Sequence, residues 1–479
     1  MNRRMVFYLI GQIIKTQAVL LTLPLITAII YREQSGFAFL ITIIFSLILG
    51  FTLTALFKPQ NKVIYAKEGF VIVALAWITM SAVGALPFVL SGEIPNFFDA
   101  FFETVSGFTT TGASILNDVE SLSHCTLFWR SFTHWVGGMG VLVFVMAILP
   151  TSDRSIHIMR AEVPGPVVGK LVPKIRDTAK ILYLIYIILT GIEFILLLFG
   201  GMSVFDSLVH SFGTAGTGGF GIKADSIAGY NNYLQWVITI FMVIFGLNFN
   251  LYYLLLLRRF KAVLKSGELW CFLGVVGVAI AVIAVNIYPL YKNIADCIRL
   301  SGFQVASIIS TTGYSTADFN QWPELSKSIL FVLMFIGGCA GSTAGGLKLT
   351  RVMIMFKSIK RELTVMLHPR SVGAVKFEGK RVGEHTLRGV HAYFAIYVVM
   401  IFLIFLILSF EPFDFETTLS AAVSCFNNIG PGLSSVGPAS SYADFSAFSK
   451  VLLSFAMLLG RLEIYPIILA FSPSTWAKK

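Results

Sequence analysis

The sequence predicts an all-α integral membrane protein, in which ten transmembrane helices form an N-terminal helical hairpin and four helix/pore-loop/helix repeats around one pseudo-four-fold pore. Of the 479 residues, 56% are hydrophobic and only 13% are charged, which is too apolar for an ordinary soluble fold. The apolar residues fall in long stretches, and one pattern of segments recurs four times along the chain. Lipid is therefore the expected solvent of this protein.

Ten apolar stretches reach about 20 residues, the length that a helix needs to cross about 30 Å of hydrocarbon. They cover residues 9–30, 37–57, 68–90, 127–150, 178–200, 233–257, 268–290, 326–347, 388–410 and 447–472. The first follows basic residues, as in a signal peptide, but Gln12, Lys15 and Gln17 interrupt it and no small-residue cleavage site follows. We therefore expect a retained first helix.

The formal net charge of +11 is explained by membrane orientation. With the amino terminus inside, most Lys and Arg residues fall on segments assigned to the cytoplasm, above all on 348–387, which is the positive-inside pattern. Both termini are then cytoplasmic, and nucleic acid is not needed as a partner. The five cysteines form no CxxC pair and no metal spacing with histidine, so neither a disulfide framework nor a zinc site is predicted.

After an N-terminal hairpin at 1–67, the chain repeats one order of segments: an apolar helix, a half-polar segment, a Gly-bearing turn and a second apolar helix. The predicted boundaries are 68–150 for pore repeat 1, 151–265 for a cytoplasmic loop and repeat 2, 266–387 for repeat 3 with a gating loop and a cytoplasmic extension, and 388–479 for repeat 4. The half-polar segments with their turns are 96–114, 203–221, 293–315 and 413–432.

Each half-polar segment predicts a short helix that enters the membrane from outside and returns. An acid near its start caps the helix and meets the positive end of the helix dipole; these acids are Asp99, Asp206, Asp296 and either Asp414 or Glu416. A helix of about ten residues is too short to span the membrane. Non-helical backbone at this depth is tolerated only where protein or a water-filled cavity satisfies its polar groups, so four such loops can enclose a pore.

The turns supply backbone suited to a cation filter, which replaces the water shell of the ion with a ring of carbonyl oxygens. Glycine lets the backbone turn these oxygens inward at low steric cost. A single Thr-Gly turn is common elsewhere, so the prediction depends on the recurrence of four. The turns are Thr110-Thr111-Gly112-Ala113, Gly216-Thr217-Gly218-Gly219, Thr311-Thr312-Gly313-Tyr314 and Asn428-Ile429-Gly430-Pro431.

With these turns the chain resembles the Trk/Ktr family of bacterial potassium transporters. The fourth turn, the N-terminal hairpin and the segment 160–166 (RAEVPGP) favour the Trk branch. The resemblance implies uptake of K+, as the transported ion, across the inner membrane. It also implies filter glycines at Gly112, Gly218, Gly313 and Gly430, and K+ coordination at Thr111, Thr217, Thr312 and Ile429.

The resemblance further implies a homodimer and a cytoplasmic nucleotide-binding regulatory subunit. The basic loops at 151–177 and 348–388 are the expected docking surface for that subunit. Two alternatives remain open: a Na+-permeable or Na+/H+-coupled transporter of the same fold, and, less favoured, a membrane-embedded enzyme. An enzyme would need converging acids, a His-rich ligand set or a nucleophile with its base, and none of these patterns is found.

The stretch at 326–347 contains five glycines in ten residues, each of which costs about 1 kcal/mol relative to alanine in a helix. The resemblance implies a broken helix whose loop gates the pore beneath the filter; the alternative is a helix crossing packed through small residues. The expected gate residues are Gly337, Gly338, Gly341, Ser342, Thr343, Gly345 and Gly346.

Arg461 and Glu193 are charges inside apolar stretches, where a lone charge costs at least about 2.5 to 3.5 kcal/mol. The resemblance places Arg461 in the permeation path, facing the glycine-rich loop, as an electrostatic part of the gate. The alternative is an interface arginine paired with a carboxylate; Glu463, two residues away, points to another helix face. Glu193 either reaches water at the outer end of its helix or is a second buried charge.

Two nucleotide-binding patterns are discarded. The sequence from Gly216 to Gly221 fits GxGxxG but lies in no strand–turn–helix context. Leu347 occupies the position where a P-loop lysine would follow Gly346. We therefore expect no nucleotide to be bound by this chain.

Overall fold

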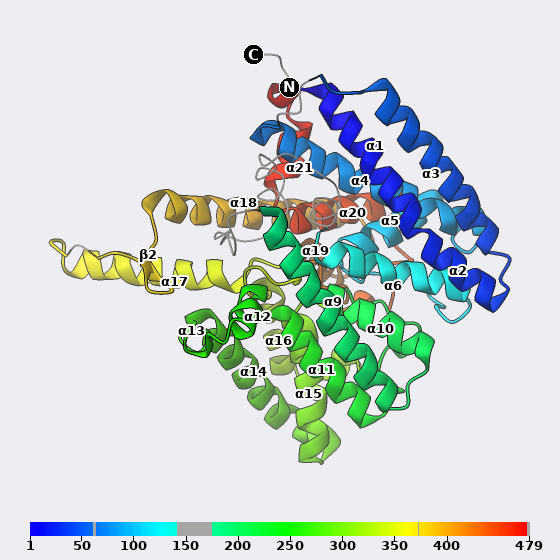
Figure 1. Ribbon diagram of the computed structural model, residues 1–479. Coiled ribbons are helices and arrows are strands. Elements are labelled where there is room, and N and C mark those ends of the chain that lie inside the picture. The colour runs from blue at the N-terminus through cyan, green and yellow to red at the C-terminus, as the bar shows by residue number, and fades with distance from the viewer. Residues whose placement is uncertain (61–63, 141–174, 372, 477–479) are drawn as a thin grey trace.

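The computed structural model describes residues 1–60, 64–140, 175–371 and 373–476, and helices form almost all of their regular structure (Figure 1). The N-terminal hairpin consists of α1 (Arg3–Leu20), α2 (Thr22–Tyr31) and α3 (Gly36–Leu56). α3 returns beside α1, and Gly50 permits the close approach, because a Cβ on it would lie 2.5 Å from Lys15 Cγ.

Four repeats follow, each with a first helix, a short pore helix and a second helix. The first helices are α4 (Ala66–Ser91), α9 (Ile175–Phe199), α14 (Gly267–Tyr291) and α18 (Glu384–Leu408). The pore helices are α5 (Phe97–Phe108), α10 (Val204–Gly216), α15 (Ile294–Ile309) and α19 (Phe415–Asn427). The second helices are α6 (His124–Gly138), α11 (Asn232–Gly246), α16 (Glu324–Ile336) and α20 (Ala447–Arg461). Most residues of the four pore helices are buried.

Shorter elements extend or connect the repeats. They are α12 (Phe249–Leu256), α13 (Phe260–Leu264), α17 (Leu349–Leu367), α21 (Tyr465–Phe471), α22 (Pro473–Trp476), the 3-10 turns η1 (Phe319–Gln321) and η2 (Ser434–Val436), and the strands β1 (Lys376–Phe377) and β2 (Lys380–Arg381). The first and last helices of the described chain are in contact, since Arg3 Nη2 donates to Trp476 O (3.5 Å).

α17 and α18 run side by side and project from the helical body as an arm (Figure 1). Its end is the antiparallel pair β1–β2, whose turn residues Glu378 and Gly379 both have positive φ, as a two-residue hairpin turn requires. Glu378 Oε1 accepts hydrogen bonds from Ser266 Oγ (3.1 Å) and Glu268 N (3.2 Å). The arm is therefore tied to the start of α14.

By length and composition, six helices of the described residues could cross a membrane, or seven if the bent pair α11 and α12 counts as one. Several predicted spans are not continuous helices. α11 and α12 meet at 92°, α16 ends before the glycine-rich segment, and α20 is separated from α21 by Leu462, Glu463 and Ile464. The expectation of continuous spans at 233–257 and 447–472 was wrong, because apolar composition does not reveal a break within an apolar stretch. The break within 326–347 agrees with the broken helix that the resemblance implied. Residues 141–150 of the span at 127–150 lie outside the described chain.

The pore helices are 12 to 16 residues long, too short to span the membrane at about 1.5 Å per residue. The predicted acids lie in their first turns, where they meet the helix dipole. Only Asp414 is itself a cap, through a bond from Thr417 N; the other caps are the side chains of Asn96, Ser203 and Asn293. The capping role expected for Asp99, Asp206 and Asp296 was therefore wrong, since these acids sit inside the helix.

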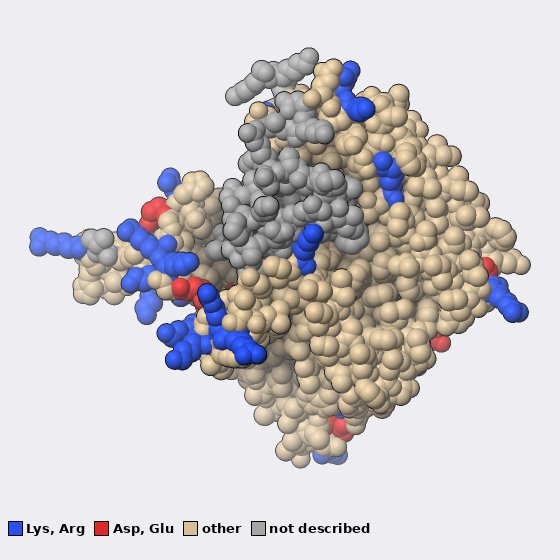
Figure 2. Space-filling view, viewed as in Figure 1, with Lys and Arg blue, Asp and Glu red and all other residues tan. Residues whose placement is uncertain are grey.

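The outside of the helical body is apolar. In the face shown in Figure 2, charged side chains are few except around the arm and α13. Along α3, Phe37 is 71% exposed and Ile48 is 63% exposed, whereas Thr42 and Ser46 are buried. This inversion of the soluble pattern is what a lipid solvent favours.

Candidate functional site

The four pore helices end in the same backbone motif. Near each helix end one non-glycine residue is left-handed, with φ of 55° to 57°: Thr110, Thr217, Thr311 and Asn428. The N–H of the next residue then donates to the carbonyl five residues earlier, as in a Schellman motif. These bonds, of 2.8 to 3.0 Å, join Thr111 to Ser106, Gly218 to Gly213, Thr312 to Ser307 and Ile429 to Ser424. A left-handed Thr or Asn is uncommon, so four at equivalent places define the register of the repeats.

Two residues after the left-handed residue each turn has a glycine with positive φ: Gly112 (78°), Gly219 (73°), Gly313 (86°) and Gly430 (103°). A Cβ on each would collide with a carbonyl of another repeat: on Gly112 with Gly218 O (2.0 Å), on Gly219 with Thr312 O (2.0 Å), on Gly313 with Ile429 O (2.1 Å) and on Gly430 with Thr111 O (2.7 Å). The contacts run from repeat 1 to 2, 3, 4 and back to 1. The turns therefore form a closed ring.

Repeat 2 differs from the sequence expectation by one residue. Gly219, rather than Gly218, is equivalent to Gly112 in conformation and in its contact with the next repeat. The reason is that Thr217 is the left-handed residue after α10, so the glycine two residues later is Gly219 and not Gly218. Gly216 is the last residue of α10 and not part of the turn. The residue before the ring glycine in this repeat is thus Gly218 and not Thr217.

A polar cavity of about 220 Å³ opens onto one side of the ring. All four ring glycines line it, together with Ser114, Asn117, Lys223 and Ser441. The part of the chain that the structure describes has no group of three or more His, Cys, Asp or Glu residues able to hold a metal ion. Oxygen atoms of backbone and hydroxyl groups are thus the ligands that this site offers, a set suited to a weakly bound alkali cation.

The glycine-rich segment is a loop on the side of the ring away from this cavity. Gly345 N donates to Thr311 Oγ1 (2.6 Å), and Gly346 N donates to Asn427 O (3.1 Å). The loop is closed at its base, because a Cβ on Gly337 would lie 3.0 Å from Gly346 Cα. The alternative of a continuous helix packed through small residues was therefore wrong.

The other expected gate residues lie within the same loop and hold it to the end of α11. Cys339 N donates to Gly246 O (2.9 Å), and Thr343 Oγ1 donates to Phe245 O (3.2 Å). Ser342 Oγ bonds back to Cys339 O (2.7 Å). The two expected gate residues that remain, Gly338 and Gly341, are glycines of the same loop and have no side chain that could anchor it.

Arg461 is the last residue of α20 and is only 7% exposed. Its guanidinium donates to Thr343 O of the loop (2.8 Å) and to Gly137 O (2.6 Å) and Gly138 O (2.8 Å) at the end of α6. The charge is thus surrounded by backbone carbonyls under the ring. An arginine fork can satisfy several acceptors at once, which a lysine ammonium on a flexible stem does less well.

Two other acids in apolar stretches are Glu463 and Glu193. Glu463 pairs with Arg351 of α17 (2.5 Å), in agreement with the expectation that Glu463 is not the partner of Arg461. The pair holds the start of α17 against the break that follows α20. Glu193 is fully buried, so its side chain does not reach water at the outer end of its helix.

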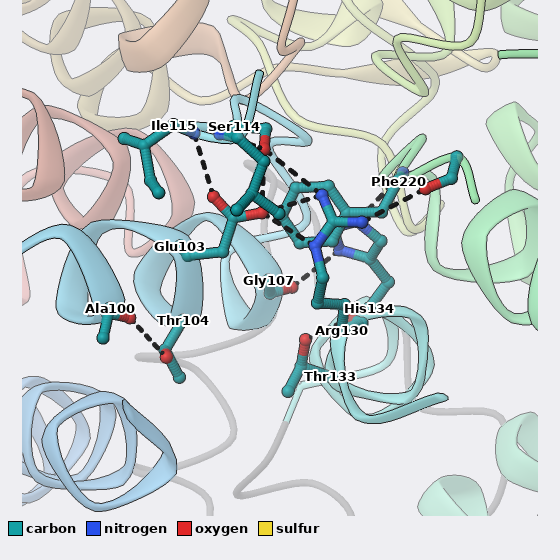
Figure 3. Close-up of polar contacts among 12 residues, drawn as sticks. Ala100, Glu103, Thr104, Gly107, Ser114, Ile115, Arg130, Thr133, His134 and Phe220 are labelled. Carbon is teal, nitrogen blue, oxygen red and sulfur yellow. Dashed lines mark hydrogen bonds and ion pairs between the residues drawn. The ribbon is translucent and has the colours of Figure 1, made fainter. Parts of the chain in front are cut away.

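Glu103 and Arg130 were missed by sequence reasoning. They form a buried ion pair of 2.7 Å behind the first turn (Figure 3). The signal was Arg130 itself, a charge in the apolar run LFWRSF. Its partner could not be identified, because the two residues lie on different helices.

The chain is similar to known proteins over its whole length. A family model described as "TrkH: Cation transport protein" matches residues 35–478. The Trk system potassium uptake protein TrkH of Salmonella typhimurium is 36% identical over 484 residues, which cover 99% of this chain and all of that protein. TrkG of Escherichia coli K12, also named a Trk system potassium uptake protein, is 33% identical, with coverage of 99% and 98%.

The same relation appears in three dimensions. The crystal structure of the potassium transporter TrkH from Vibrio parahaemolyticus superposes with a TM-score of 0.89, at 30% identity and with both chains fully covered. The multi-helix membrane fold and the transport class agree with what the sequence predicted, and the family is one of transporters and not of enzymes. This chain belongs to the TrkH family of cation transport proteins.

Proposed function

We propose that this chain takes up K+ across the bacterial cytoplasmic membrane, with the closed ring of turns as its selectivity filter. The observation that carries the proposal is the contact of each ring glycine with a carbonyl of the next repeat, made by Thr111, Gly218, Thr312 and Ile429. The similarity to TrkH and TrkG, which are named potassium uptake proteins, supports K+ as the ion. We assign the four carbonyls as K+ ligands.

The pore helices add to the attraction for a cation. Each ends at the ring, so its carboxyl end, with a partial charge of about −0.5, is directed to the centre. Four such ends stabilise a single monovalent cation without a fixed carboxylate, which would bind the ion too tightly for rapid release. Conduction needs binding that is favourable but weak.

The glycine-rich loop and Arg461 are proposed as the gate. The loop lies under the ring through Gly345 and Gly346, and Arg461 joins the loop to the end of α6. In this state a fixed positive charge and a folded loop both oppose the passage of a cation. Opening requires that Arg461 and the loop separate or move together.

A homodimer and a cytoplasmic nucleotide-binding subunit are proposed as partners. The arm and α13 carry a basic surface, with few acids in this region in Figure 2. Its exposed cations include Arg258, Arg259, Lys261, Lys265, Lys357, Lys360, Arg370, Lys376, Lys380 and Arg381. We assign this surface to the cytoplasmic side by the positive-inside rule and propose it as the dock. Most of the second expected dock, 151–177, and the segment 160–166 lie outside the described residues.

The function is tested by ion flux into proteoliposomes that contain only this chain, with K+, Rb+, Na+ and a pH gradient varied in turn. The proposal expects K+ and Rb+ uptake that exceeds Na+ uptake. Equal Na+ and K+ fluxes would favour the Na+-permeable alternative. Uptake of K+ that requires an inward H+ or Na+ gradient would favour the coupled alternative.

Deletion of Gly338 to Gly345 is expected to raise unregulated K+ flux while the order of ion preference stays unchanged. The two ends that the deletion would join are already close, because a Cβ on Gly337 would lie 3.0 Å from Gly346 Cα. Flux is measured per folded protein, after size-exclusion chromatography. Loss of flux in folded protein would show that the loop is structural packing and not a gate.

A further inference from the structure

The buried pair of Glu103 and Arg130 holds the first turn from behind (Figure 3). Glu103 is fully buried and Arg130 is 2% exposed. Arg130 Nε (2.8 Å) and Nη2 (2.7 Å) both donate to Glu103 Oε1. The same carboxylate accepts hydrogen bonds from Ser114 Oγ (3.0 Å) and Ile115 N (3.0 Å), two residues that directly follow the ring in repeat 1.

Arg130 also contacts the turn of repeat 2. Its Nη1 donates to Gly221 O (3.1 Å), and its guanidinium lies 4.0 Å from the ring centroid of Phe220. A cation over an aromatic face is attracted by the ring quadrupole. One side chain of α6 therefore joins two turns that are about a hundred residues apart in sequence.

His134 repeats this connection one helical turn further along α6. Its Nδ1 lies 2.8 Å from Gly107 O, and its Nε2 accepts a hydrogen bond from Phe220 N (3.3 Å). A carbonyl can only accept and an amide N–H can only donate, so the ring is the neutral tautomer with the proton on Nδ1. Arg130 and His134 lie four residues apart on one helix face and form, with Glu103, a clamp between pore helix 1 and turn 2.

The charged clamp belongs to repeat 1. Glu103 lies seven residues before the left-handed residue of its turn, and the equivalent positions of the other repeats hold His210, Gln304 and Ala421. Only Glu103 can form an ion pair there as a carboxylate. The four turns differ in sequence, so no exact four-fold symmetry makes the distances between their carbonyls equal. Side chains behind the turns must therefore set these distances.

We propose that Arg130, held by Glu103, is a positioning residue that sets the distance between turns 1 and 2 and thereby the preference for K+ over Na+. The proposal rests on the proposed K+ function. A buried ion pair is a weak source of stability, since apolar or neutral replacements of both partners are often tolerated, and its best-attested use is to select one geometry. The ring contact between turns 1 and 2 is that of Gly112 with Gly218 O, and Arg130 and Glu103 connect the two turns that make it.

The test measures ion flux in proteoliposomes for three proteins. They are the wild type, the single variant Arg130→Lys, and a double variant that carries both Glu103→Gln and Arg130→Gln. The double variant leaves no stranded charge, so it is expected to fold. Its Na+ to K+ flux ratio is expected to rise about tenfold, which equals about 1.4 kcal/mol and is the order of one hydrogen bond to a charged group. Arg130→Lys keeps the charge but loses the fork to Gly221 O and Ser114 Oγ, so an intermediate ratio is expected.

Lys327→Gln is the matched control, because Lys327 pairs with Glu324 (2.7 Å) at the start of α16 and is not in the ring or the clamp. Its flux ratio should equal that of wild type. A double variant with lower total flux but an unchanged ratio would overturn the proposal, as would an unchanged ratio in Arg130→Lys if the double variant fails to fold. A wild type without K+ preference would instead refute the proposed function.

Discussion

Replacement of Arg461 by alanine is expected to raise K+ flux through folded protein. The guanidinium remains charged at any physiological pH and is buried among the carbonyls of Thr343, Gly137 and Gly138. A fixed positive charge under the ring raises the electrostatic barrier for a cation, so its removal should increase flux at least about tenfold, which equals about 1.4 kcal/mol. Loss of the bond to Thr343 O also releases the loop from α6.

Arg461→Lys is the matched control, because it keeps the positive charge and removes the fork. A gate that acts through charge predicts low flux in the lysine variant and high flux in the alanine and glutamine variants. Single-channel recording or tracer uptake, normalised to the monodisperse fraction, measures this. Reduced flux per folded molecule in the alanine variant would contradict the gate and favour an ion-pairing role.

The class of fold could be predicted because it depends on quantities that a single sequence contains. Apolar length reports membrane crossing, and the recurrence of short capped helices before Gly turns reports re-entrant loops. The breaks after α11 and α20 could not be predicted, since Leu247 is as apolar as its surroundings and Glu463 is one charge between Leu462 and Ile464 in an otherwise apolar stretch. What bends the chain there is the positive φ of Glu463 and Ile464 and the cap by Asn248.

The register of repeat 2 shows a second limit. Gly218 and Gly219 are chemically identical, and only the left-handed conformation of Thr217 decides which of them reaches the ring position. The resemblance, and not spacing, suggested where Arg461 would lie. The clamp of Glu103 and Arg130 joins helices that sequence distance cannot pair, so it required the structure.

Substitution of a ring glycine by alanine is expected to lower the K+ to Na+ flux ratio at least about tenfold, or about 1.4 kcal/mol. At Gly112 the change imposes a side chain at φ 78° and puts its Cβ 2.0 Å from Gly218 O. At Gly219 the Cβ meets Thr312 O at 2.0 Å, so this variant also tests the register of repeat 2. In both cases a carbonyl of the next repeat must move, and a filter with one displaced carbonyl coordinates K+ less well than before.

Gly92→Ala separates this effect from backbone strain. Gly92 ends α4 with φ 78°, the same angle as Gly112, but a Cβ there has nothing within 4 Å. The control should therefore lose about 1 kcal/mol of stability from the left-handed conformation and keep its ion preference. Purified variants are compared by K+ and Na+ uptake in proteoliposomes at equal folded amounts. If Gly112→Ala and Gly219→Ala match Gly92→Ala in ion preference, the ring is not the selectivity filter, because strain alone would then account for all three variants.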